Sequence, residues 1–231
     1  MGSGSLITFP TLLAIGVPPL TANVSNNIGL VPGSLSGAWG YRHELAGQHR
    51  RLLRLGPACL AGGALGAGLL LVLPPGAFEA IVPALIAMGL LLVVFGPAIS
   101  RRVAASAAAR GGHPEHGPGW VASLIFGTGV YGGYFGAAQG VLLMAVLGIG
   151  IEDSLQRLNA TKNVLAVLIN GVAALIFVFV ADVDWLVVAL IATGAVIGGQ
   201  VGAKVGRRLP ANVLRGVIVV VGVAALVSFF V

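Results

Sequence analysis

The sequence has little charge and almost no cysteine. Charged residues make up 9% of the 231 positions and hydrophobic residues 57%, whereas a soluble domain carries roughly a quarter charged residues. This small number of charged side chains cannot cover the surface of a water-soluble fold. The composition therefore excludes a water-soluble globular protein. Cys59 is the only cysteine and lies in an apolar run. Disulfide frameworks and cysteine-rich metal sites are therefore excluded, and we expect Cys59 to be a small buried hydrophobe.

Carboxylates are also scarce, and none lies deep in an apolar run. The seven are Glu44, Glu79, Glu115, Glu152, Asp153, Asp182 and Asp184. A cation site or a proton relay inside a membrane usually needs a carboxylate at depth, so their absence there favours an anion or a neutral solute. The net charge of +6 does not indicate nucleic-acid binding, because the basic residues cluster in short loops between apolar runs.

Long apolar runs are what the sequence does contain. About 20 apolar residues are needed to cross the ~30 Å hydrocarbon core of a bilayer. We predict full spans at residues 20–40, 52–73, 77–99, 153–181, 185–206 and 211–230. The long polar connection 100–118 holds His113 and His116. Two histidines in a flexible loop lack a third ligand, so we expect neither a metal nor a cofactor.

Other apolar stretches are too short to be ordinary spans. Residues 120–135 and 137–149 meet at a break with glycines at positions 132, 133, 136 and 140. This pattern predicts two half-helices, because irregular backbone at membrane depth is tolerated only where protein or a water-filled cavity surrounds it. Residues 6–15 follow Gly2, Ser3, Gly4 and Ser5, and we interpret them as the second half of another such pair.

The chain repeats itself at a constant offset of 136 positions. This offset relates residues 24–27 to 160–163, the GGxxGA pattern at 62–67 to that at 198–203, and the Leu-Pro pair at 73–74 to that at 209–210. A shared offset over roughly fifty residues indicates two copies of one unit. We assign the copies to residues 1–99 and 119–231, joined by a cytoplasmic loop at 100–118. The arm at 120–135 has no counterpart, so we expect the first half-helix of the first copy to be missing from this sequence.

The charge pattern predicts that the two copies are inverted. If residues 120–149 enter and leave on the same side, each copy has three full crossings. Every basic cluster then falls on one side, which the positive-inside rule makes the cytoplasm. The clusters are Arg42, Arg50, Arg51 and Arg54, then Arg101, Arg102 and Arg110, then Lys204, Arg207 and Arg208, with Asp182 and Asp184 outside. We therefore predict an all-α integral membrane protein of two inverted-topology repeats, each a broken, re-entrant half-helix pair plus three transmembrane helices.

Polar side chains inside the predicted spans recur in both copies. The spacing of Asn159, Asn163 and Asn170 places them within roughly 60° on one helix face. The same stripe occurs 136 positions earlier as Asn23, Asn27 and Ser34, and Ser25, Asn26, Thr161 and Lys162 flank the two stripes. Such groups either join helices through hydrogen bonds or face a substrate path. Both interpretations stay open, and the duplication favours the path.

Two features indicate an anion. Lys162 is the one cation well inside a predicted span. It either binds an anion or extends its ammonium group to the cytoplasmic interface, and the sequence does not choose between these. The N-termini of the half-helices present free N–H groups and the positive end of a dipole. Ser3, Ser5 and Gln139 lie where such termini are expected.

The chain resembles a known family. The stretches GSGSLITFPTLLAIGVPP and ANVSNNIGLVPGSLSGAWGYRHEL resemble the first repeat of the sulfite exporter TauE/SafE family, and NATKNVLAVLINGVAALIF, with DVDW, GGxxGA and RRLP, resembles its second. The resemblance implies a permease of two inverted repeats that exports sulfite, sulfoacetate or related sulfonates, or takes up other small organic anions. It also implies a pathway formed by the breaks at residues 2–5 and 136–140 and by the stripes of Asn27 and Asn163.

We therefore expect a secondary transporter and not an enzyme. It would move a small organosulfur anion, with export as the expected direction, across a prokaryotic inner membrane in which it is a multi-pass protein. The alternatives are a facilitator for another carboxylate or inorganic anion, or a membrane assembly or electron-transfer partner. We expect a small anionic substrate, contact with membrane lipid, no nucleic acid, and a monomer or homodimer.

Overall fold

The computed structural model describes residues 4–109 and 118–205, and residues 216, 219, 220, 223, 224 and 227. Within these residues the fold is all-helical, as predicted. The helices are α1 (Ser5–Ala14), α2 (Pro19–Gly40), α3 (His49–Val72), α4 (Pro75–Ala109), α5 (Gly119–Tyr134), α6 (Gln139–Gly150), α7 (Leu155–Val180) and α8 (Trp185–Val205). Ser3 and most of the predicted span 211–230 lie outside the described residues.

Several helices have the length and composition of membrane spans. His49–Val72, Gly76–Gly96 of α4 and Gln156–Val180 are long and apolar enough to cross a membrane, whereas Ser5–Ala14, Gln139–Gly150 and Trp185–Gly198 are apolar but shorter. The helix limits follow from local chemistry. Proline occupies the first position of α2, where its missing N–H costs nothing. The Ser154 hydroxyl caps α7 by accepting from the backbone N–H of Arg157, which satisfies an otherwise unbonded donor.

One predicted boundary differs from the structure. Helix α4 continues to Ala109, so the first ten residues of the expected connection 100–118 are helical. This stretch is rich in alanine and arginine, which are strong helix formers, and the next glycine is Gly111. His113 and His116 lie outside the described residues. The placement of residues 100–118 in the cytoplasm stays a prediction.

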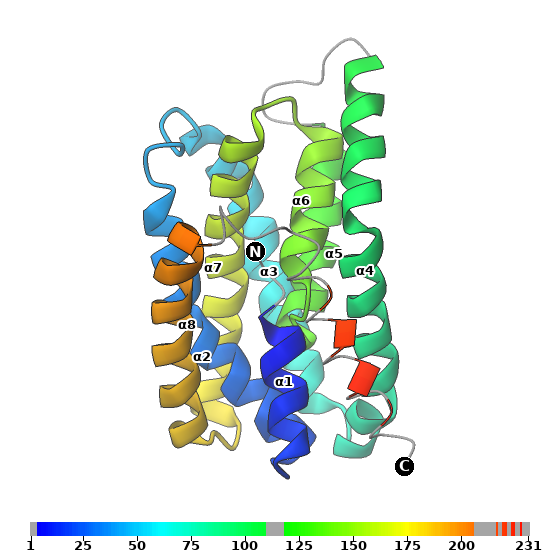
Figure 1. Ribbon diagram of the computed structural model, residues 1–231, viewed down its shortest axis with the longest axis vertical. Coiled ribbons are helices and arrows are strands. Elements are labelled where there is room, and N and C mark those ends of the chain that lie inside the picture. The colour runs from blue at the N-terminus through cyan, green and yellow to red at the C-terminus, as the bar shows by residue number, and fades with distance from the viewer. Residues whose placement is uncertain are drawn as a thin grey trace.

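The helices stand side by side in one bundle (Figure 1). Helix α2 packs against α7 and α8, α3 packs against α5 and α7, and α4 packs against α6. Figure 1 shows that α2 and α7 run in opposite directions, as do α3 and α8. Helices α5 and α6 enter the bundle and return to the same end, so they form the hairpin of two short helices that the glycine-rich break predicts.

Close backbone contact fixes this hairpin against α3. A Cβ atom added at Gly66 would overlap the carbonyl oxygen of Val130, and one added at Gly133 would overlap that of Gly63. Glycines let helices in a membrane approach this closely. On the other side of the break, the rings of Phe9 and Phe135 meet edge to face with their centroids 5.1 Å apart, so α1 is held next to the break.

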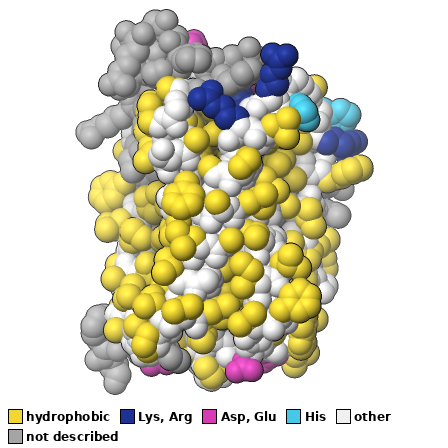
Figure 2. Space-filling model, turned by 180° about the vertical axis from the view of Figure 1, so that it is seen from behind, with side chains coloured by type: hydrophobic (Ala, Val, Ile, Leu, Met, Phe, Trp, Pro, Cys, Tyr) yellow, Lys and Arg dark blue, Asp and Glu magenta, His cyan; other side chains and the backbone are white. Residues whose placement is uncertain are grey.

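The outer surface is apolar between two charged ends. Figure 2 shows apolar side chains over the side of the molecule, basic and histidine side chains at the end that holds the α2–α3 loop, and acidic side chains at the opposite end. Trp39 and Trp185 are 71% and 58% exposed, and each lies at an end of its helix. Tryptophan favours membrane–water interfaces, so this surface suits a lipid environment.

Candidate functional site

The break between α5 and α6 is an ordered piece of irregular backbone. Gly136 has φ 75° and Ala138 has φ 58°, a conformation that is unusual for alanine and costs strain. Two hydrogen bonds hold it. The Tyr131 hydroxyl donates to the carbonyl oxygen of Ala137 at 2.6 Å, and Asn23 Nδ2 donates to that of Tyr134 at 2.9 Å. Carbonyl groups released by the end of α5 are thereby satisfied, as a membrane interior requires.

Two amide side chains beside this break have unsatisfied atoms. Gln139, the first residue of α6, is 3% exposed. Neither its Oε1 nor its Nε2 has a hydrogen-bond partner among the described residues, and the same holds for Oδ1 of Asn27, which is 6% exposed. Gln139 Oε1 and Asn27 Nδ2 lie 3.7 Å and 3.8 Å from the position that a Cβ at Gly136 would occupy. Each buried unsatisfied group costs about 1–3 kcal/mol, so this arrangement is suited to a polar ligand.

The other polar residues of α2 that were predicted to bind substrate have different partners. Asn26 Oδ1 accepts from the Thr8 hydroxyl of α1, and Ser25 Oγ accepts from the backbone N–H of Asp184 at 3.0 Å. Asn23 contacts the break, as described above. Ser5, at the start of α1, is 8% exposed. Ser34 donates to the carbonyl oxygen of Leu30 in its own helix, so the hydrogen of its hydroxyl is already bonded within α2.

The stripe on α7 is less uniform. Thr161 is fully buried and donates to Gln48 Oε1. Asn163 is half-buried and its Nδ2 lies 3.4 Å from the carbonyl oxygen of Gly37. Asn159 and Asn170 are also half-buried. Lys162 is 3% exposed, which argues against the alternative in which its ammonium group reaches the aqueous interface. The binding roles of both stripes stay predictions.

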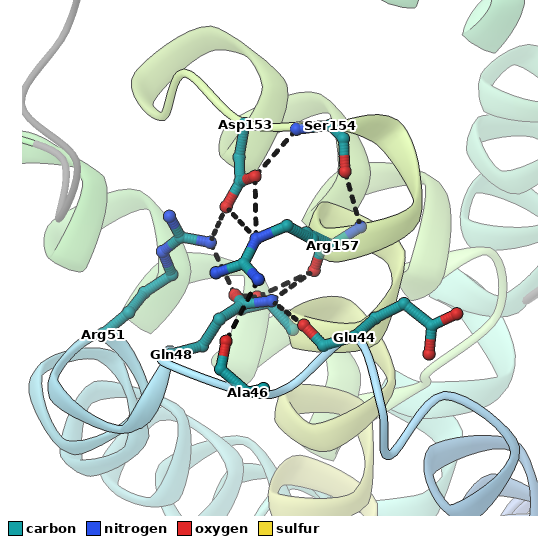
Figure 3. Close-up of polar contacts among 8 residues, drawn as sticks. Glu44, Ala46, Gln48, Arg51, Asp153, Ser154 and Arg157 are labelled. Atoms are coloured by element: carbon teal, nitrogen blue, oxygen red, sulfur yellow. Dashed lines mark hydrogen bonds and ion pairs between the residues drawn. The ribbon is translucent and has the colours of Figure 1, made fainter.

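A charged cluster at the α2–α3 loop was not anticipated from the sequence (Figure 3). Arg51 is 2% exposed and its Nη1 lies 2.8 Å from Asp153 Oδ2. Arg157 Nε lies 2.9 Å from the other oxygen of the same carboxylate. Arg157 also donates to the carbonyl oxygen of Ala46 at 3.0 Å, and Gln48 Nε2 donates to that of Arg157 at 3.1 Å. We call these four side chains, Gln48, Arg51, Asp153 and Arg157, the loop cluster; it ties the α2–α3 loop to the start of α7.

The carboxylate at the centre of the loop cluster is held ionised. Burial raises the pKa of Asp153, but hydrogen bonds from Arg51, from the backbone N–H of Ser154 and from Arg157 outweigh it and hold the pKa below its ordinary value. The i,i+4 spacing of Asp153 and Arg157 was the one signal in the sequence. Arg51 had been counted only as one of several loop charges. No group of three or more His, Cys, Asp or Glu side chains suited to a metal occurs within residues 4–109 and 118–205.

The contacts at the two ends of the bundle are related by the repeat. Thr161 donates to Gln48 at one end, and Ser25 accepts from Asp184 at the other. Shifting Ser25 and Gln48 by 136 positions gives Thr161 and Asp184. The two hydrogen bonds therefore join positions related by the same offset, although the hydroxyl donates in one and accepts in the other. Helix packing follows the same rule, because α2 contacts α8 as α7 contacts α3, and α1 contacts α2 as α6 contacts α7.

Comparison with known proteins identifies the family. A family model described as sulfite exporter TauE/SafE matches residues 1–229. A probable membrane transporter protein of Haemophilus influenzae is 24% identical over 225 residues, covering 95% of this chain and 83% of that protein. The probable membrane transporter protein ORF9 of Sinorhizobium sp is 27% identical over 234 residues, covering 96% and 83%. No solved structure matches the chain. These relatives are named as transporters and not as enzymes, and the chain belongs to the sulfite exporter TauE/SafE family of membrane transporters.

Proposed function

We propose that the protein is a secondary transporter that exports a small organosulfur anion, such as sulfite, sulfoacetate or a related sulfonate, across the inner membrane of a prokaryote. The observation that carries the proposal is the pair of buried amides, Gln139 and Asn27, whose unsatisfied atoms lie beside a helix break. Discontinuous helices at membrane depth are typical of transporter binding sites. Membership of the family supports the substrate class.

The charges around the break favour an anion. Helix α6 begins at Gln139, beside the break, so the positive end of its dipole lies there. Lys162, a cation on α7, is also buried within the bundle. The described carboxylates lie near helix ends or in loops, where they do not compete for this position. A negatively charged ligand is thus better stabilised than a cation.

We further propose that the two copies are inverted repeats that alternate access to this site. The antiparallel α2 and α7, and the matching contacts of Ser25 with Asp184 and of Thr161 with Gln48, support this arrangement. The two ends differ in one respect. The repeat partners of Arg51 and Asp153 are Val187 and Val17, so only one of these matching positions carries the ion pairs of the loop cluster.

The orientation of the protein in the membrane is inferred from its charged ends. Exposed Arg42, Arg50 and Arg54 lie in or beside the α2–α3 loop, which the positive-inside rule places in the cytoplasm. Asp182 lies in the loop between α7 and α8, on the opposite side. Reporter fusions after Gly47 and after Asp182 should give opposite sides, and the same side for both would contradict the inverted arrangement.

Flux in proteoliposomes tests the function. Purified protein is reconstituted and uptake of sulfite, sulfoacetate, taurine, sulfate and acetate is compared. We expect saturable flux of an organosulfur anion, reduced at least tenfold by Gln139→Leu. The matched control is Thr193→Val, because this hydroxyl bonds only within α8, to the carbonyl oxygen of Ala189. Flux of acetate or sulfate alone would favour the facilitator of another anion, and equal flux in Gln139→Leu would contradict the site.

A further inference from the structure

We propose that the ligand bound beside Gly136 is an oxyanion that also carries its own hydrogen-bond donor, an O–H or N–H group. The inference rests on the proposed function and narrows its substrate class. It favours hydroxysulfonates and singly protonated acids such as hydrogensulfite. It disfavours anions that offer acceptor oxygens alone, such as sulfoacetate or fully ionised sulfite.

The argument begins with the number of unsatisfied atoms. Gln139 leaves one donor group, Nε2, and one acceptor, Oε1, and Asn27 leaves a second acceptor, Oδ1. A fully ionised oxyanion has no hydrogen to donate, so it would pair with Nε2 and place its remaining oxygens against the amide oxygens. Leaving a buried acceptor unsatisfied costs about 1–3 kcal/mol. A ligand with one donor and several acceptors pairs with both kinds of atom.

The orientation of the amides does not remove this requirement. Turning an amide over exchanges its oxygen and nitrogen. For Gln139 the exchange leaves one donor group and one acceptor, because both of its atoms are unsatisfied. For Asn27 the exchange replaces an acceptor with a donor, and the acceptor of Gln139 still remains. In every orientation the site presents at least one amide oxygen to the ligand.

Three side-chain donors around the break are already engaged. The Tyr131 hydroxyl is committed to the carbonyl oxygen of Ala137, and the Asn23 amide nitrogen is committed to that of Tyr134. The Thr8 hydroxyl is committed to Asn26. These three donors already bond within the protein, whereas the Tyr134 hydroxyl has no partner within the part of the chain that the structure describes. A ligand that brings its own donor can satisfy Gln139 Oε1 without displacing any of these three bonds.

The Gln139 amide is closely packed on the side that faces Gly132. A Cβ atom at Gly132 would overlap Gln139 Oε1 and would lie 2.8 Å from Cγ2 of Ile169. A Cβ atom at Gly136 would lie 3.0 Å from the carbonyl oxygen of Gly132. Backbone and a branched side chain are therefore tightly packed on this side of Gln139. A compact ligand, with its donor close to its oxyanion, fits this geometry best.

Matched pairs of monoanions test the proposal. Binding to purified wild-type protein is measured for ethanesulfonate against 2-hydroxyethanesulfonate, and for methanesulfonate against hydroxymethanesulfonate. Members of each pair share charge and nearly share size, and differ in one hydroxyl. We expect the hydroxylated member to bind about tenfold more tightly, equivalent to about 1.4 kcal/mol. For sulfite, affinity should rise as the pH falls and the hydrogensulfite fraction grows.

The wild-type protein alone shows whether the hydroxyl group matters, and the variants show which residues recognise it. Asn27→Leu and Gln139→Leu should bring the affinity ratio of each pair towards one. Thr11→Val should leave the ratio unchanged, because this hydroxyl lies on the exposed side of α1 and bonds to Ile7 in the same helix. Equal affinities for both members in the wild type would overturn the donor proposal and leave the transporter intact. If no anion in the panel bound or moved, the proposed function itself would be wrong.

Discussion

Replacement of Asp153 by asparagine is the perturbation that most sharply tests the loop cluster. The change keeps the shape of the side chain but removes the charge that pairs with Arg51 at 2.8 Å and Arg157 at 2.9 Å. Removing one partner of a fully buried pair costs about 3–5 kcal/mol, whereas an exposed pair contributes about 0–1 kcal/mol. Arg51 is 2% exposed, Asp153 14% and Arg157 34%, so we expect a loss of about 2–4 kcal/mol.

This loss translates into a shift between conformations. If the loop cluster forms only when its end of the bundle is closed, the closed state loses the full 2–4 kcal/mol. At 1.4 kcal/mol per factor of ten, the ratio of closed to open molecules falls about 30-fold to 700-fold. The opening is measured as the alkylation rate of a cysteine introduced by Asn163→Cys in a Cys59→Ser background. Asn163 lies two residues beyond the buried Thr161 on α7, so opening at this end should expose it to the reagent.

The control is the neighbouring carboxylate. Glu152→Gln changes charge by the same amount at an exposed position, so it should leave the alkylation rate unchanged while Asp153→Asn raises it at least 30-fold. Arg51→Met combined with Asp153→Asn should raise the rate by much less than the product of the single effects, since both remove the same pair. Equal rates for Asp153→Asn and Glu152→Gln would refute the assignment of a closing contact.

Further predictions concern stability and affinity. Because the folded-state pKa of Asp153 is lowered, its stabilisation is complete above the unfolded value of about 3.9 and is lost as pH falls through the folded value, so thermal denaturation should show a steeper acid loss in the wild type than in Asp153→Asn. Gly66→Ala should cost about 1–3 kcal/mol in the free energy of unfolding, whereas Gly68→Ala, with open space around its Cβ, should cost nothing measurable or stabilise slightly. Tyr131→Phe removes the hydroxyl that holds the carbonyl of Ala137. It should raise KM and leave the unfolding temperature nearly unchanged; a lower unfolding temperature with an unchanged KM would contradict this.

The helices and the break follow from local sequence properties. Proline marks the start of α2 and follows the end of α3, and the glycines from 132 to 136 mark the end of α5. These signals are local, because hydropathy and backbone freedom act within one or two turns. The repeat added information that is not local. It related Ser25 to Thr161, and in the structure Ser25 bonds to Asp184 and Thr161 bonds to Gln48 at opposite ends of the bundle.

The loop cluster could not be found by the same reasoning. Arg51 and Asp153 are about one hundred positions apart, and each lies near the end of an apolar run, where a charge is ordinary. Only tertiary packing distinguishes a buried arginine from an exposed one. The stripe on α2 illustrates a second limit. Helical spacing places Asn27 and Ser34 on one face, but it does not decide that Ser34 bonds to its own helix while an oxygen of Asn27 stays unsatisfied.

The most direct test of the binding site is the position of a bound anion. Selenite, a heavier analogue of sulfite, allows its selenium atom to be located by anomalous scattering in crystals of the purified protein. We predict a peak beside Gly136, with the oxygens of the anion within hydrogen-bonding reach of the amides of Gln139 and Asn27. A peak found only at the loop cluster, with Gln139 sealed against apolar side chains, would contradict a substrate site at the break.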